Sequence, residues 1–415
     1  MNSEKTDLWL MFCSRGARSI AAGILTVIVS LYYKSIYHSV APIGFLFGAG
    51  ALGVPILSYS AGRWADRYGR KKLLLLTISF LPAAIAMILL TTNYYVLLLS
   101  SALGGFGIAG AIVGGGVGAS AAPMQIALLA EKTNTGNRTM VFSLFQIMSS
   151  ITASAGAASA SLSNFHNLFY IALILSVLSF LIALPISESF KPQTGNDRDR
   201  RGLLERRKKT AAENENSKTI NKFVMTGVMN GAAQGFIVPF FPIILQSNMG
   251  MSAGTIGYLF AAGGLVSALL MFATPYLTKR LGFVKFIMST RSVSSLFAIY
   301  FPFATSAIAA SIAYVILSAT RSISLPAQSS LMMNLVNENT RAYATGINQS
   351  ARLLPSAASS SSSGEILDFF SYVIPFEIAF VLNAANIYLY YRFFGKLASA
   401  NKTVEVLHER ETERL

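Results

Sequence analysis

The chain has 415 residues, of which 53% are hydrophobic and only 12% are charged. A soluble domain carries about 25% charged residues, so this composition predicts that the chain is folded in a membrane. The single cysteine, Cys13, excludes an internal disulfide and makes a cysteine-rich metal site implausible. The net charge of +15 raises nucleic-acid binding as an alternative.

Apolar segments of membrane-spanning length recur along the whole chain. A spanning helix needs about 20 mostly apolar residues. Such segments cover residues 8–33, 42–62, 72–92, 95–130, 139–162 and 166–187, and then 222–246, 253–277, 285–304, 306–336, 342–366 and 370–394. They predict an all-α polytopic protein of twelve transmembrane helices in two six-helix bundles, residues 1–187 and 222–396. The N-terminal segment is too long for the core of a cleavable signal peptide.

Two polar segments flank the second bundle. Residues 188–221 are basic and poor in aromatic side chains, which predicts a flexible cytoplasmic linker. Residues 397–415 are expected to form a cytoplasmic tail.

Lysine and arginine alternate between the connections, which predicts the orientation. The connections that contain Arg63, Lys132, Lys279 and Arg341 are basic, whereas the opposite ones carry almost no cation except Lys34. Because positive loops stay on the cytoplasmic side, we expect both termini in the cytoplasm and the protein in the plasma membrane, in contact with lipid. This alternation argues against nucleic acid as a partner.

The two halves repeat each other. Ile43–Leu52 reads IGFLFGAGAL and Ile256–Leu265 reads IGYLFAAGGL, at an offset of 213 residues. Pro123 and Gln146 correspond to Pro326 and Gln349 at an offset of 203 residues. Internal duplication of this kind is typical of secondary transporters.

A short motif follows the second apolar segment, where the chain reads GRWADRYGRKK. It resembles the signature G-x-x-x-D-R-x-G-R-[RK] of the major facilitator superfamily, in a prokaryotic or archaeal form whose subfamily stays open. The matching residues are Gly62, Asp66, Arg67, Gly69, Arg70 and Lys71. The resemblance implies that they form a gating latch, and a degenerate copy lies at Pro275–Lys285. The motifs of proton-coupled drug exporters in the fourth and fifth segments are missing.

Arginines within the apolar segments are the main candidates for binding a substrate, since ionisable groups at membrane depth are costly and commonly functional. Arg18, Arg321 and Arg352 lie deep in segments that, by the resemblance, line or flank a central cavity. Arginine binds carboxylate and phosphate groups well, which favours an anionic small molecule. The alternative is that these arginines satisfy helix ends, backbone carbonyls or Glu377. Arg15 and Arg291 lie nearer the cytoplasmic interface and are expected to be structural.

Neutral polar residues add to this candidate site. Asn230 and Gln234 are four residues apart and share a helix face, while Gln146 and Gln349 occupy equivalent places in the two halves. Each of these amides binds substrate or joins helices.

The sequence predicts a secondary active transporter that works by alternating access, and not an enzyme. No phosphate-binding loop is present, so we expect a proton gradient to drive transport, with Glu377 as the candidate proton carrier. The histidines lack metal-pair spacing, and no cofactor is expected. The alternatives are an efflux carrier for hydrophobic drugs and a non-transporting membrane sensor. The oligomeric state stays open.

The glycine-rich run Gly104–Gly118 contains G-x-G-x-x-G, the dinucleotide-binding fingerprint. That fingerprint needs a preceding strand, whereas this run lies inside an apolar span of membrane length. The first half is also ten residues longer than the second in this region. We therefore expect a fourth helix that is broken, bulged or unusually long. The serine-rich run Pro355–Glu365 is expected to pack helices and not to act as a hydrolase site.

Overall fold

The computed structural model describes residues 3–107, 121, 124–125, 128–129, 132–133, 138–187, 210–336 and 341–412. Regular structure in this part of the chain consists of α-helices and short 3-10 helices. In the first half these are α1 (Ser3–Ile36), α2 (Ala41–Tyr68), α3 (Arg70–Leu90), α4 (Tyr94–Gly104), α6 (Arg138–Ala158), η3 (Ser159–Ser161) and α7 (Phe165–Ala183). In the second half they are α9 (Thr210–Ile237), η4 (Val238–Phe240), α10 (Phe241–Met249), α11 (Ala253–Leu281), α12 (Phe283–Tyr300), η5 (Phe301–Phe303), α13 (Ala307–Leu335), α14 (Arg341–Phe369) and α15 (Ile374–Thr412).

Each predicted apolar span overlaps at least one of these helices, and part of the span 95–130 lies outside the described residues. Six of the described helices are long and apolar enough to cross a membrane. They are Lys5–Ile36, Arg70–Leu90, Phe165–Ala183, Asn216–Met249, Ala253–Leu281 and Ala307–Leu335. Helix α14 is less apolar because it is rich in serine, and small polar residues of this kind allow close packing between helices.

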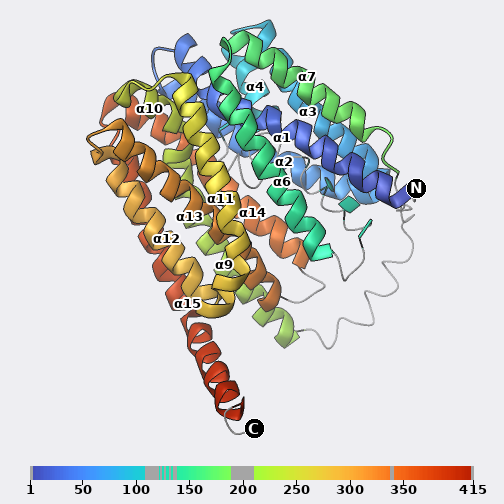
Figure 1. Cartoon of the computed structure of the whole chain (residues 1–415), viewed down its shortest axis with the longest axis vertical. Helices are drawn as coiled ribbons and strands as arrows, with labels where there is room; N and C mark the ends of the chain where they lie inside the picture. Colours follow the sequence, from blue (N-terminus) through green and yellow to red (C-terminus); the bar gives the residue numbers. More distant parts are fainter. Residues whose placement is uncertain are drawn as a thin grey trace.

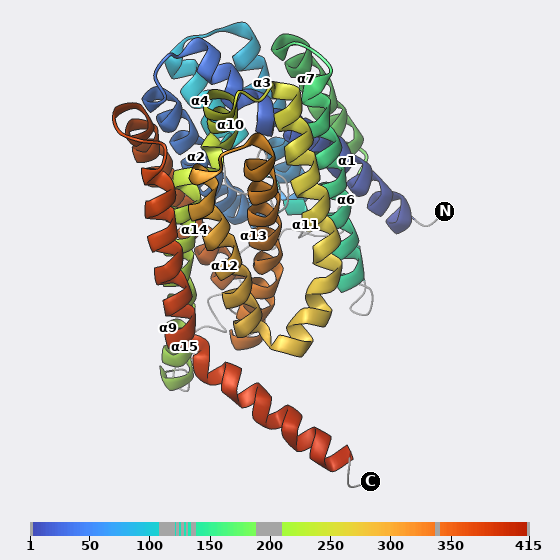
Figure 2. The ribbon, with the colours of Figure 1, turned by 60° about the vertical axis from the view of Figure 1, so that its left-hand side comes forward.

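Two predicted boundaries need correction. Helix α9 begins at Thr210, so residues 210–221 of the predicted flexible linker are helical. Helix α15 continues to Thr412, so most of the predicted tail is helical too, and Figure 2 shows this end of α15 projecting away from the bundle.

The glycine-rich run interrupts the fourth apolar span, as its composition predicts. Helix α4 ends at Gly104, and Gly105 and Gly107 adopt φ values of 65° and 80°. The run therefore follows a helix, unlike the dinucleotide fingerprint, which follows a strand. Residues 108–118 of the run lie outside the described residues.

The two halves lie side by side and share a large apolar core at one end, with a further small cluster of Ala51, Val54, Leu353 and Ala357 between α2 and α14. Figure 1 shows the blue-to-green first half beside the yellow-to-red second half. The largest buried cluster contains residues of both halves, including Phe47 of α2 and Phe240 of η4, whose rings are 5.5 Å apart. At the opposite end each half has its own cluster, one around Met11 and the other around Phe223. The halves are thus packed together at the predicted extracellular end.

Close helix packing supports this joined end. Helix α2 runs against α14, and α6 runs against α11. A Cβ atom placed on Gly44 of α2 would lie 2.9 Å from the Cα atom of Gly364 in α14. No side chain larger than hydrogen fits there unless the two backbones separate.

A carboxylate of the second half caps a helix of the first half. Asp368, in the last turn of α14, accepts hydrogen bonds from the N–H groups of Val40 and Ala41, each at 2.7 Å, and from the hydroxyl of Ser39. A negative charge at the N-terminus of a helix is stabilised by the helix dipole. Partial burial raises the pKa of Asp368, but these hydrogen bonds outweigh it and hold the pKa below its ordinary value.

Replacing Asp368 with alanine should therefore loosen the joined end. In a Cys13→Ser background, a cysteine at the buried position of Val40 should react faster with a membrane-impermeant maleimide once Asp368 is replaced. Because the pKa of Asp368 is lowered, its contribution is present at neutral pH and is lost only as the pH falls through that lowered value. Labelling that is equally fast with and without Asp368 at neutral pH would contradict the capping role.

Candidate functional site

A cavity lies inside the second half, between α9, α12, α13 and α15. It is lined by Asn230, Ala233, Gln234, Ile237, Arg291, Ser294, Ala298, Leu317, Arg321 and Asn383. These walls contain two arginines and no acidic residue, so the cavity favours negative charge.

Three of the predicted binding residues meet in this cavity. Gln234 donates a hydrogen bond of 2.9 Å to the side-chain oxygen of Asn230, as their spacing on one helix face predicts. Arg321 approaches from α13, and its Nη1 atom is buried without a hydrogen-bond partner among the described residues. The Nδ2 atom of Asn230 is also buried and unpaired. The cavity therefore presents hydrogen-bond donors that have no acceptor in the described part of the chain.

Arg291 also lines the cavity, which corrects the expectation that it reaches the cytoplasmic interface. Its side chain is buried and donates to the side-chain oxygens of Gln328, at 2.6 Å, and Asn386. Its guanidinium carbon lies 4.6 Å from the ring centroid of Tyr390. These partners are neutral, so the positive charge of Arg291 stays uncompensated by them.

Arg18 belongs to a similar polar group in the first half. Its Nη2 atom donates a 2.6 Å hydrogen bond to Gln125, and its Nη1 atom is buried without a partner in the described part of the chain. Arg15 donates to Ser149 at 3.0 Å and to the same Gln125 oxygen at 3.4 Å. Arg15 is thus buried between helices, contrary to the expectation that it lies at the interface.

The remaining predicted binding residues lie outside the lining of the cavity. Arg352 is half-buried on α14 and close enough to Arg291 and Arg321 to be repelled by their charges. Gln146 of α6 and Gln349 of α14 are half-buried. Among the described residues, neither glutamine forms a hydrogen bond through its side chain.

The motif between α2 and α3 forms the expected tight turn. Gly69 has a φ value of 97°, and its counterpart Gly282, between α11 and α12, has 75°, so both halves use a glycine-only conformation at this turn. Arg70 and Lys71 open α3 and are half-buried. Gly62, Asp66 and Arg67 lie in α2, but their side chains fall outside the described residues. The latch therefore stays a prediction.

Glu377, the candidate proton carrier, lies at a helix end. It occupies the first turn of α15 and is exposed, and it is not among the residues that line the cavity. A carboxylate in this position is stabilised by the helix N-terminus, which accounts for it without a role in proton transfer. Its coupling role stays a prediction.

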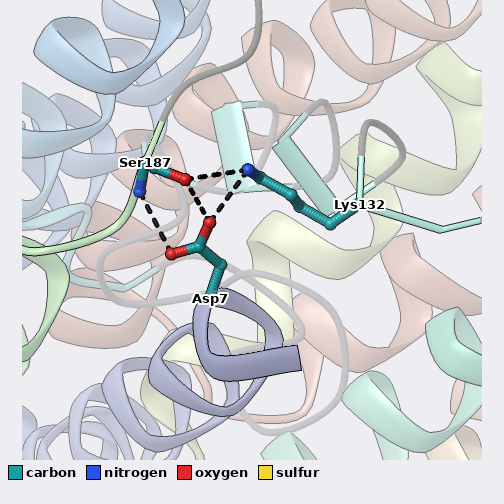
Figure 3. A network of polar contacts seen from close by, with 3 residues as sticks. All are labelled: Asp7, Lys132 and Ser187. Carbon is teal, nitrogen blue, oxygen red and sulfur yellow. Dashed lines mark hydrogen bonds and ion pairs between the residues drawn. The ribbon is translucent and has the colours of Figure 1, made fainter. Parts of the chain in front are cut away.

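A buried acid that the sequence analysis missed lies at the other end of the first half. Figure 3 shows Asp7 of α1 facing Lys132 and Ser187, which follows α7. The Asp7 carboxylate lies 2.8 Å from the Lys132 ammonium, and both side chains are at most 5% exposed. Asp7 also accepts hydrogen bonds from the N–H and the hydroxyl of Ser187. The ion pair and the hydrogen bonds from Ser187 together join three segments that are far apart in sequence.

The sequence repeat identifies one further pair of functional candidates. Gln125 and Gln328 each stand two residues after the matched prolines, at the same offset of 203 residues. Each accepts a hydrogen bond of 2.6 Å from a buried arginine. The arginine comes from α1 in the first half and from α12 in the second, so the two sites are not copies of each other.

Comparison with known proteins identifies the family. The family model of the Major Facilitator Superfamily matches residues 10–360. The chain belongs to this superfamily. Its members are transporters, and its all-α fold with two pseudo-symmetric six-helix bundles is the one that the apolar spans and the motif predict. The chain is therefore a multi-pass membrane protein that transports a small molecule.

Solved transporters share the fold at low sequence identity. A mutant form of the nucleoside transporter NupG superposes with a TM-score of 0.73, at 14% identity, over 95% of this chain and 100% of that one. A D-xylose–proton symporter gives 0.72 at 13% identity, over 94% and 98%. The human organic anion transporter MFSD10 (TETRAN) gives 0.64 at 13% identity, over 94% and 100%.

One curated relative is similar over a short region. Multidrug resistance protein 2 of Bacillus subtilis (strain 168) is 30% identical over 76 residues, which are 18% of this chain and 19% of that protein. The match thus spans about a fifth of the relative's length.

The Asp7–Lys132 pair predicts a strongly non-additive effect on stability. Removing one partner of a buried ion pair costs about 3–5 kcal/mol, because the other charge loses its counterion. Asp7→Asn and Lys132→Met should each lower the melting temperature of the purified protein, and the double variant should lose less than the two changes added together. Lys396→Met, at an exposed position of α15, is the matched control and should melt like the wild type. Strictly additive losses would show that the pair contributes no coupling.

Proposed function

We propose that the chain is a secondary active transporter for an anionic organic metabolite. The single observation that carries this proposal is the shortage of acceptors around three arginines of the membrane-spanning helices, of which Arg18 is buried and the other two are half-buried. Arg18 forms one hydrogen bond through its side chain, and Arg321 and Arg352 form none within the described residues. No described carboxylate pairs with them. A guanidinium with so few acceptors inside a membrane protein favours a ligand that brings a carboxylate or phosphate.

Alternating access is the mechanism that this fold supports. The two halves meet at the end where Asp368 caps α2, whereas each half has a separate core at the other end. With both termini in the cytoplasm of a cell-membrane protein, as the basic loops predict, this arrangement faces inward. Rocking of the two bundles would break the contacts between α2 and α14 and expose the site to the other side.

A proton gradient is the energy source that we propose. The D-xylose–proton symporter with the same fold gives a precedent for such coupling, and no phosphate-binding loop for ATP occurs in the sequence. Glu377 is the carrier that the sequence suggests. Asp7 is an additional buried acid, but its pairing with Lys132 favours a structural role.

A multidrug carrier is the second candidate, and the short similarity to Multidrug resistance protein 2 favours it. Such a carrier would bind apolar or cationic compounds, for which a cavity lined by Arg291 and Arg321 is electrostatically unsuitable. The human protein with the same fold is named an organic anion transporter, but its 13% identity extends only to the fold. The positive charge of the cavity therefore favours an anionic solute over the apolar or cationic compounds of a multidrug carrier.

Transport by the reconstituted protein tests the proposal. In proteoliposomes with an imposed proton gradient, the wild type should move labelled organic anions in preference to neutral sugars and cationic drugs. Arg18→Gln and Arg321→Gln should each lower the rate by at least about tenfold, the factor that corresponds to losing one charge-assisted contact of about 1.4 kcal/mol.

Arg392→Gln is the matched control, because Arg392 is exposed on α15. It should transport like the wild type. Normal anion transport by both Arg18→Gln and Arg321→Gln would refute the anion site, and transport of cationic drugs alone would favour the multidrug carrier.

A further inference from the structure

Buried donors without an acceptor in the described part of the chain gather around the cavity of the second half. Three residues that line its cavity each have a buried nitrogen without a partner among the described residues. These atoms are Nε of Arg291, Nη1 of Arg321 and Nδ2 of Asn230. Buried donors are almost always paired in proteins, so three unpaired donors around one cavity indicate a missing acceptor.

The charge of Arg291 is fixed in place but not neutralised. Gln328 and Asn386 accept from its two terminal nitrogens, and Asn386 in turn donates a 2.5 Å hydrogen bond to the carbonyl of Thr226. The ring of Tyr390 stacks against the guanidinium. This support orients the guanidinium before any ligand arrives, which lowers the entropic cost of binding.

Like charges surround the same place. Arg352 lies within electrostatic reach of both Arg291 and Arg321. The charges of Arg291 and Arg321 thus repel that of Arg352, and an oxyanion bound between the first two would offset this repulsion.

The two arginines of α1 in the first half share one acceptor. Gln125 accepts from both Arg15 and Arg18, and no residue of the first half lines the cavity. Arg15 and Arg18 thus lie outside the cavity that Arg291 and Arg321 line.

We propose that the acidic group of the solute binds inside the second half, held by Arg291, Arg321 and Asn230. This inference rests on the proposed function and makes it more specific. The ligand group is an oxyanion, either carboxylate or phosphate, since both accept several hydrogen bonds from guanidinium groups. The position of Arg291 in its apolar span suggests a structural role near the cytoplasmic interface. In this proposal it is instead a residue that determines specificity.

The smallest probes test this site independently of the rest of the solute. The melting temperature of the purified full chain is measured with acetate and, separately, with inorganic phosphate, at an ionic strength held constant with chloride. A ligand that binds the folded state raises the melting temperature. We expect at least one probe to stabilise the wild type and Arg392→Gln by several degrees, and to leave Arg291→Gln unaffected. Stabilisation by acetate alone would indicate a carboxylate ligand, and stabilisation by inorganic phosphate alone would indicate a phosphate ligand.

Asn230→Asp is the decisive second variant, and it does not depend on Arg291→Gln remaining folded. Its carboxylate replaces an amide of the same shape and supplies an acceptor to the unpaired donors. The melting temperature without probe should rise above that of the wild type, and the stabilisation by either anion should disappear.

Two results would overturn the inference. One is a wild type that neither probe stabilises. The other is an Asn230→Asp variant that melts lower than the wild type and still responds to the anions. Transport of organic anions that survives Arg291→Gln but is lost in Arg18→Gln would place the site in the first half and leave the proposed function intact. No transport of anions by the wild type would refute the proposed function itself.

Discussion

A buried guanidinium needs acceptors, and apolar helices in a membrane supply few of them. This constraint organises both halves of the molecule. In each half, a glutamine at the same repeat position, Gln125 or Gln328, accepts a hydrogen bond from a buried arginine. The remaining donors, on Arg18, Arg291 and Arg321, stay unpaired within the described residues. The fold thus leaves positive charge available inside the membrane-spanning helices, where we propose that the solute binds.

The second requirement is that the two halves separate at one end while they hold together at the other. Small residues such as Gly44 and Gly364 bring the backbones of α2 and α14 into contact, and the cap from Asp368 adds a directional interaction. Both are local contacts that rocking would break together, which is how packed interfaces switch between discrete states. The Asp7–Lys132 pair has a different role, because it lies within one half and would move with it as a unit.

The sequence predicts most of the fold because apolar spans, basic loops and the repeat are local patterns. It predicts the interruption after Gly104 for the same reason. It fails where burial depends on which face of a helix meets its neighbours: Arg15 and Arg291 are as near the helix end as expected, yet packing buries both. It also misses the contact between Asp7 and Lys132, because no local pattern joins residues so far apart in the chain. Glu377 is the clearest acid within the apolar spans of the sequence, and the structure places it in an exposed first turn.

We infer above all that the unpaired arginine donors bind an anion. Matched pairs of organic acids and their uncharged methyl esters or amides test it most directly, by their effect on the melting temperature of the wild-type protein. The account predicts that acids raise the melting temperature and that their neutral analogues, of nearly equal size and shape, do not. Stabilisation by esters, amides or cationic compounds, with none from any acid, would contradict it.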